Sequence, residues 1–214
     1  MLFTENPFLL YDIFHRIEGG QMNIEIEDPL IPGTILKRTD MGNVTGLEFL
    51  NKIFYITDGI MLTEIREISG IDGTTLQNWT KRGWVANAKL KRYDKDQLAH
   101  ILIINMLRAC MQLDRIAFLI QYINGSLTDR GDDIIRDSVL YDYICRILDR
   151  LMEGGSCNPE GLRRCISEVT ADYEERVTGA RRRLERALEI IVFAYYASIL
   201  KQHSGNMIEK LMRI

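Results

Sequence analysis

The sequence lacks the residue patterns that mark most enzymes and metal proteins. Its 214 residues include 4 cysteines and 3 histidines, with no Cys-x-x-Cys pair and no cysteine at ligand spacing from a histidine. We find no nucleophile–base pair and no glycine-rich phosphate loop, and His100 is expected to pack or bond locally on an apolar helix. The sequence therefore predicts no catalytic residue, no metal site and no cofactor. The cysteines are expected to be reduced thiols, partly buried in helices: Cys110, Cys145, Cys157 and Cys165.

Long apolar runs and a secretory leader are also missing. No window reaches the ~18 apolar residues that a membrane span requires, and the most apolar stretch, residues 190–200, is expected to form a buried helix. The N-terminus carries acidic and aromatic residues instead of a basic start. These features predict a cytoplasmic protein without membrane contact.

Helix signals dominate most of the chain, so the fold class is expected to be mainly α. Residues 1–60 are expected to form an N-terminal helical and irregular segment, with a helix opening at Asn6-Pro7. Residues 61–125 are expected to hold a winged helix-turn-helix with a small β wing, and residues 126–214 a C-terminal helical bundle. Caps and stop residues place the helices at 47–57, 64–69, 73–82, 95–109, 114–122 and 133–152, with a long one from Asn158-Pro159 that continues or divides at Gly179.

The helix over residues 73–82 is expected to carry a polar recognition face. Leu76 and Trp79 fall toward the opposite side, and Trp79 is expected to pack in the core instead of stacking on bases. Glutamine and asparagine side chains can pair bidentately with adenine in the DNA major groove. The preceding helix and the turn at residues 70–72 have the length of a helix-turn-helix elbow. The recognition face recurs at i, i+3, i+4 and i+7: Thr74, Gln77, Asn78 and Lys81.

A cationic loop follows this helix. Gly83 lets the chain reverse, and Trp84 and Val85 are expected to pack back on the core as the first strand of a wing. From residue 81 to 95, six cations face one acid, Asp94, on a chain with a formal net charge of -3. Any contact with nucleic acid would therefore come from this local surface. The cations expected to hold DNA phosphates are Arg82, Lys89, Lys91 and Arg92.

Several of these stretches also resemble a known family. IDGTTLQNWTKRGWV (residues 71–85), KRYDKDQL (91–98) and LDRI (113–116) resemble the winged helix-turn-helix of MerR-type regulators. More closely, residues 61 to about 150 resemble the bacterial family called domain of unknown function 1836, in which Leu-x-Asn-Trp/Tyr-x-Lys, a basic wing and Tyr-x-x-x-x-Leu recur. YING (122–125) and DDII (132–135) add to this resemblance, which covers a little under half of the chain.

The MerR-type resemblance has limits and implications. Those proteins place an arginine and a tyrosine where this chain has Gln77 and Asn78, and an arginine in the wing where it has Lys91, so their DNA site does not transfer. They pair through a long helix after the module and sense ligands at its end. The resemblance therefore implies a homodimer through the C-terminal helices and a small-molecule effector. We expect a sequence-specific regulator of transcription that binds double-stranded DNA.

Three alternatives stay open. An interaction adaptor would keep the winged fold and bind protein instead of DNA. An acidic cluster would bridge Mg²⁺ and a diphosphate if its members shared a helix face, although acids in a first helical turn also complement the helix dipole. The basic run at residues 181–183 would bind nucleic acid, but interleaved glutamates favour a salt-bridged, solvated face. The acidic cluster comprises Asp129, Asp132, Asp133 and Asp137.

Overall fold

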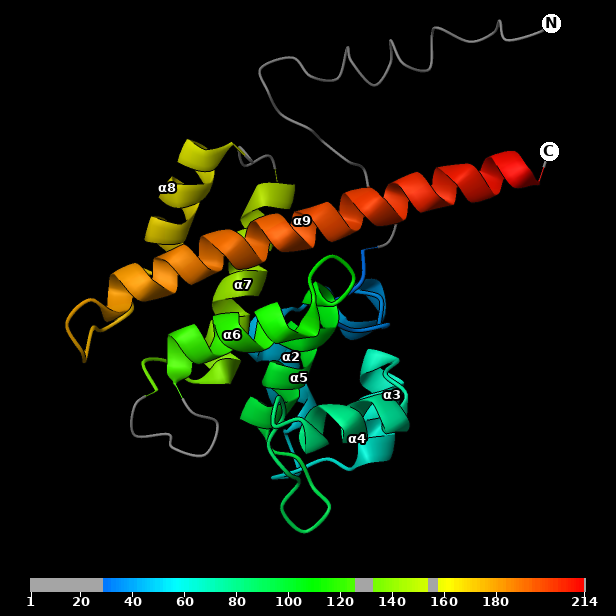
Figure 1. The fold of residues 1–214 in the computed structure, drawn as a ribbon, viewed down its shortest axis with the longest axis horizontal. Coiled ribbons are helices and arrows are strands. Elements are labelled where there is room, and N and C mark those ends of the chain that lie inside the picture. Colours follow the sequence, from blue (N-terminus) through cyan, green and yellow to red (C-terminus); the bar gives the residue numbers. More distant parts are fainter. Residues whose placement is uncertain (1–28, 126–132, 154–157, 214) are drawn as a thin grey trace, which may run out of the picture.

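The computed structural model describes residues 29–125, 133–153 and 158–213, and these residues are mainly helical, as the sequence predicts. Figure 1 shows the helices packed together, with one long helix lying across them. The helix expected at Asn6-Pro7 lies outside the described residues. The elements in chain order are η1 (Thr39–Met41), α2 (Gly46–Ile53), α3 (Leu62–Ser69), α4 (Gly73–Lys81), α5 (Lys95–Leu107), α6 (Leu113–Asn124), α7 (Asp137–Met152), α8 (Pro159–Val169) and α9 (Ala180–Met212).

Helix α5 lies at the centre of the core. A capping box begins it: the Asp94 carboxylate accepts from the Gln97 N–H at 2.9 Å, and the Asp94 N–H donates to Gln97 Oε1 at 3.0 Å. Between residues 97 and 107 every side chain except Asn105 is buried, as expected for a helix that is apolar on all sides. Helix α5 packs against α3, α6, α7 and α9, and α7 packs in turn against α2. The α5–α7 pair therefore positions the other helices.

The segment before α2 is held against this pair. Tyr141 Oη donates to the Pro32 carbonyl at 2.7 Å, and Asn105 Nδ2 donates to the Gly33 carbonyl at 2.8 Å. Gly33 has a φ of 78°, and a Cβ there would lie 2.3 Å from the Leu102 carbonyl oxygen. Only glycine lets the chain approach α5 this closely. A hydrophobic core cluster extends from this segment into α9. The domain boundaries expected at residues 61 and 126 stay a prediction.

Helix α9 is the longest described element. Its 33 residues span about 50 Å at the usual helical rise. Its first half covers α5, α6, α7 and α8. Beyond residue 200 it projects past the body of the molecule (Figure 1), and there every described residue except Met207 is exposed. An apolar stripe at helical spacing is buried along its first half: Ala180, Leu184, Ala187 and Ile191.

The long helix expected from Asn158 is interrupted well before Gly179. Helix α8 ends at Val169, and the side chains of Thr170 and Arg181 bond to carbonyls at this end. Thr170 Oγ1 donates to the Ile166 carbonyl at 2.9 Å, and Arg181 Nη1 donates to the Thr170 carbonyl at 3.0 Å.

The helix expected over residues 133–152 begins only at Asp137.

The small β wing expected from the sequence is absent from the described residues, where no sheet forms. Only isolated antiparallel bridges occur, at Lys89–Arg92, Ile60–Tyr93 and Leu30–Lys37. The side-chain amide of Gln97 donates to the Ala86 carbonyl at 3.3 Å and to the Asn87 carbonyl at 3.0 Å. The carbonyls of Ala86 and Asn87 would pair with a second strand if a wing formed. Here they accept hydrogen bonds from Gln97 of α5 instead.

Candidate nucleic-acid interface

Helix α4 presents an exposed polar face. Its N-cap, Asp72, accepts from the backbone N–H groups of Thr74 at 3.1 Å and Thr75 at 3.4 Å, which fixes where the helix begins. Leu76 and Trp79 are 1% and 2% exposed and hold the helix against the core, so Trp79 is a core residue as expected. The four residues predicted to face a DNA groove are all exposed: Thr74, Gln77, Asn78 and Lys81.

Helix α3 precedes α4 through a tight turn, and the two lie together at one edge of the molecule (Figure 1). Helix α3 is followed by Gly70, whose φ is 68°. Ser69 Oγ donates to the Ile65 carbonyl at 2.6 Å and accepts from the Ile71 N–H at 3.2 Å. Helix α3 packs against both α4 and α5. The turn is therefore fixed by its own hydrogen bonds, and the second helix of the pair carries the exposed face.

The segment after α4 packs back on the core. The Trp84 N–H donates to the Trp79 carbonyl at 2.9 Å, and Val85 is 2% exposed. The Arg82 guanidinium carbon lies 5.0 Å from the centroid of the Trp84 ring, close enough for a cation–π contact. Trp84 is partly buried against the core, so Arg82 and the core together cover much of its ring.

A four-residue turn, Lys89–Arg92, carries most of the remaining local cations; we call it the cationic turn. Lys89 and Arg92 exchange both backbone hydrogen bonds at 2.9 Å. Leu90 and Lys91 between them have φ values of 51° and 63°, the sign expected for a type I′ turn. Left-handed backbone costs ~1–2 kcal/mol for each non-glycine residue. Both side chains are exposed, so no packing within the described residues offsets this cost.

The predicted phosphate contacts are not equivalent. Arg82, Lys89, Lys91 and Arg92 are all exposed, and within the described ranges none of them forms an ion pair. Arg92 Nη1, however, donates to the Gly59 carbonyl at 2.6 Å. Arg92 therefore anchors the cationic turn to the segment before α3. Sequence reasoning missed this role, because Gly59 lies 33 residues earlier in the chain.

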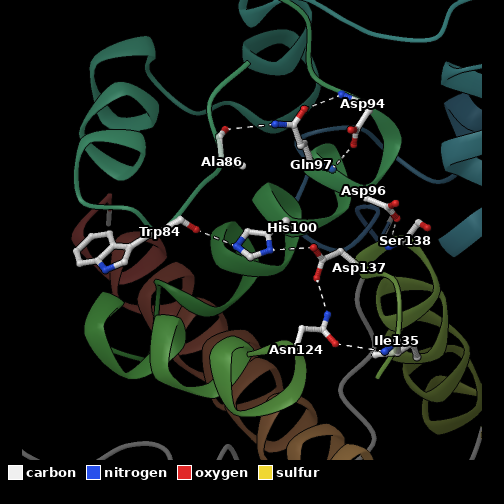
Figure 2. A network of polar contacts seen from close by, with 10 residues as sticks. All are labelled: Trp84, Ala86, Asp94, Asp96, Gln97, His100, Asn124, Ile135, Asp137 and Ser138. Atoms are coloured by element: carbon white, nitrogen blue, oxygen red, sulfur yellow. Dashed lines mark hydrogen bonds and ion pairs between the residues drawn. The ribbon is translucent and has the colours of Figure 1, made fainter. Parts of the chain in front are cut away.

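A buried polar network links the segment after α4 to helix α7 (Figure 2). His100 is 4% exposed; its Nε2 lies 2.9 Å from the Trp84 carbonyl and its Nδ1 lies 3.1 Å from Asp137 Oδ2. Both ring nitrogens therefore have a polar partner, and which nitrogen donates depends on the tautomer of the ring. Asn124 Nδ2 donates to Asp137 Oδ1, and Asn124 Oδ1 accepts from the Ile135 N–H, each at 3.3 Å.

His100 was expected to pack or bond locally: it is buried, but its hydrogen bonds are not local. Its partners Trp84 and Asp137 are 16 and 37 residues away in sequence, and no local pattern signals either of them. The Ile135 N–H, two residues before α7 begins, bonds to the Asn124 side chain.

A cavity of about 480 Å³ adjoins the network, between the segment after α4 and helix α6. Its volume falls within the range of small-molecule sites. A molecule bound there would contact both the chain that follows α4 and the start of α7. The lining includes Trp84, His100, Phe118, Gln121, Asn124 and Asp137.

The two described members of the acidic cluster do not share a helix face, which a diphosphate site would need. Asp129 and Asp132 lie outside the described residues, and Asp133 precedes α7, which begins at Asp137. Both carboxylate oxygens of Asp137 already bond to side chains. Within the described ranges no group of three or more His, Cys, Asp or Glu side chains is placed to hold a metal ion.

The arginine-rich start of α9 makes contacts within the protein. Arg181 Nη1 lies 3.9 Å from Glu185 Oε1, and Arg163 Nε lies 3.0 Å from Glu189 Oε1. These contacts support the salt-bridged interpretation of this helix face. No helix in the described part of the chain is long and apolar enough to cross a membrane.

The described cysteines are free thiols. Burial raises the pKa of Cys110, Cys145 and Cys165, so all three stay protonated and weakly nucleophilic at neutral pH. Cys145 and Cys165 are buried in α7 and α8, as expected, whereas Cys110 is exposed after the end of α5. Cys157 lies outside the described residues.

Comparisons with known proteins give a family match but no function. Residues 48–144 match the model of a family described as Domain of unknown function (DUF1836). The chain is 25% identical over 96 residues to "Uncharacterized protein YkrK" of Bacillus subtilis (strain 168). That match covers 43% of this chain and 41% of the relative, so the chain spans less than half of the relative's length. No solved structure matches.

Proposed function

We propose that this protein is a binding protein and not an enzyme, and that it recognises double-stranded DNA by sequence to regulate transcription. The observation that carries the proposal is that the exposed amide face of α4 is followed by exposed cations that form no ion pair in the described residues. Amides can read base edges, while unpaired cations can hold phosphates.

The α3–turn–α4 unit would dock as a helix-turn-helix. Helix α4 would enter the major groove, with Gln77 and Asn78 at the base edges and Lys81 at a phosphate. The cationic turn would act as the wing. It needs no sheet for this role, because Arg92 and the Ile60–Tyr93 bridge already hold it to the rest of the protein.

Reversing the charge of Lys89 and Lys91 together tests the proposal. Lys89→Glu with Lys91→Glu should weaken binding to any duplex, and it should lower the slope of log Kd against log salt concentration by about 2, one for each lost phosphate contact. Binding to a labelled random-sequence 30-base-pair duplex can be followed by fluorescence anisotropy. Arg92 is left intact, because its bond to Gly59 would confound the result.

A matched control is Arg164→Glu with Arg182→Glu, which makes the same charge change at two exposed residues of α8 and α9. This variant should bind DNA like the wild type. Equal binding by both double variants would contradict the proposal. Little retention on heparin and no salt dependence would point instead to an interaction adaptor.

We further propose that two copies pair through α9. A second apolar stripe runs along this helix at alternating steps of three and four residues, the spacing of a coiled-coil seam. Its large apolar members are 37–70% exposed where a value is given, and Ala197 and Ser204 supply small residues between them. A dimer would let two α4 helices contact two DNA half-sites. The stripe comprises Ile190, Phe193, Ala197, Leu200, Ser204, Met207 and Leu211.

The effector implied by the MerR-type resemblance stays a prediction, and we place it in the cavity beside His100. A ligand there would contact Trp84, three residues after α4 ends, and Asp137 at the start of α7. Binding of an effector in this cavity should therefore change both the fluorescence of Trp84 and the Kd for DNA. A compound that changes only one of them would not be such an effector.

A further inference from the structure

Leu90, at the tip of the cationic turn, is an apolar side chain that packs against nothing in the described residues. It is 96% exposed, more than any other large apolar side chain in the described residues. It also occupies left-handed backbone, where glycine or asparagine is usual. Because the fold gains neither packing nor backbone stability from a leucine here, the residue is suited to a contact outside the chain.

The charges around Leu90 indicate what that contact is. Lys89, Lys91 and Arg92 flank it on both sides, all exposed and without ion pairs in the described part of the chain. An apolar tip between cations matches a duplex groove, where phosphates border a floor of stacked bases. A lipid surface would require more apolar area than one leucine supplies.

The cationic turn follows α4 closely in sequence, and this closeness favours the minor groove as the site that Leu90 contacts. Seven residues separate Arg82, the C-cap of α4, from Leu90. With α4 in the major groove, a turn this close along the chain reaches the neighbouring minor groove. Proteins that bind the minor groove insert leucine and similar side chains between base steps and kink the duplex by about 20–90°.

We propose that Leu90 is an apolar wedge that enters the minor groove, partly unstacks a base step and bends the DNA. This inference rests on the proposed function, and it adds that DNA shape contributes to recognition. Lys89 and Lys91 hold the phosphates on the two sides of the groove, and the left-handed backbone keeps Leu90 at the tip. Sites with an easily unstacked pyrimidine–purine step, such as TA, bind more tightly than sites without one.

The test measures bending separately from binding. A 30-base-pair duplex selected from a random pool by the wild-type protein, with a fluorophore at each end, reports bending by energy transfer and binding by anisotropy. Leu90→Ala should lose most of the energy-transfer change while its Kd rises only roughly three- to tenfold, because the cations remain. Leu90→Met, which keeps a large flexible apolar side chain, should bend the duplex like the wild type.

A matched control is Ile56→Ala, which removes a 90% exposed apolar side chain outside the cationic turn; it should leave binding and bending unchanged. Wild-type-like bending by Leu90→Ala, or binding by the wild type without bending, would overturn the wedge and leave the proposed function standing. Absence of duplex binding by the wild type would overturn both. Leu90-dependent binding to phosphatidylglycerol vesicles, without DNA bending, would identify a membrane contact instead.

Discussion

At the scale of single residues, helical periodicity separates Gln77 from its neighbours Leu76 and Trp79. The two apolar side chains are almost fully buried, whereas Gln77 and Asn78 are exposed. This could be predicted, because a helix with apolar residues at one angular position must turn the intervening ones outward. The role of Arg92 could not, because its bond to Gly59 depends on how two distant segments meet.

Replacing Gln77 by alanine tests base recognition at this scale. If its amide contacts one base in a bidentate manner, Gln77→Ala should reduce discrimination at one base position by ~1–3 kcal/mol, with little change in non-specific affinity. Selection of bound sequences from a random pool, by wild type and variant, measures this. The control is Gln112→Ala, which changes another exposed glutamine. An unaltered preference in the Gln77 variant would exclude the contact.

At the scale of elements, α9 has two apolar stripes, of which one is buried and the other is exposed. The stripe that begins at Ala180 is buried against the other helices, while the stripe that begins at Ile190 stays exposed and continues past residue 200. The sequence predicted a buried helix over residues 190–200, but only Ile191 and Val192 of that range are buried. How far along α9 the helices α6, α7 and α8 bury its side chains is decided only by how these helices pack.

Leu200→Glu tests the proposed seam, where Leu200 is 39% exposed. A carboxylate in an apolar dimer contact would be desolvated without a partner, so the variant should be monomeric at concentrations where the wild type is dimeric. Sedimentation velocity measures the change. Gln202→Glu adds the same acid on an exposed position outside the stripe and should stay dimeric. A monomeric wild type, or a dimeric Leu200→Glu variant, would exclude this seam.

At the scale of the whole molecule, buried tyrosines join separate parts of the chain. Burial raises the pKa of Tyr143 to about 12, helped by its hydrogen bond to Asp172, and burial raises that of Tyr195 to about 12. Burial also raises the pKa of Tyr141 well above its usual value. The folded state therefore keeps protons that the unfolded chain loses near pH 10.

The contribution of these tyrosines to stability should consequently be complete below pH 10 and fall as pH rises from 10 toward 12. Each of these tyrosines contributes up to ~1.4 kcal/mol per pH unit to that loss. Urea unfolding between pH 8 and 11 measures it. Tyr143→Phe should flatten the profile, whereas Tyr55→Phe, at an 86% exposed position, should not. A midpoint that stays constant to pH 11 in the wild type would contradict the expectation.

The sequence by itself determined the mainly helical class, the capping box of α5 and the exposed face of α4, because each depends on residues within a few positions of one another. Tertiary structure decided the contacts between distant segments: the His100–Asp137 bond, the anchor of Arg92 on Gly59 and the free end of α9. It also decided that Gln97, and not a second strand, binds the carbonyls after Val85. Local spacing fixes a helix and its faces, but which polar groups meet depends on how the helices pack.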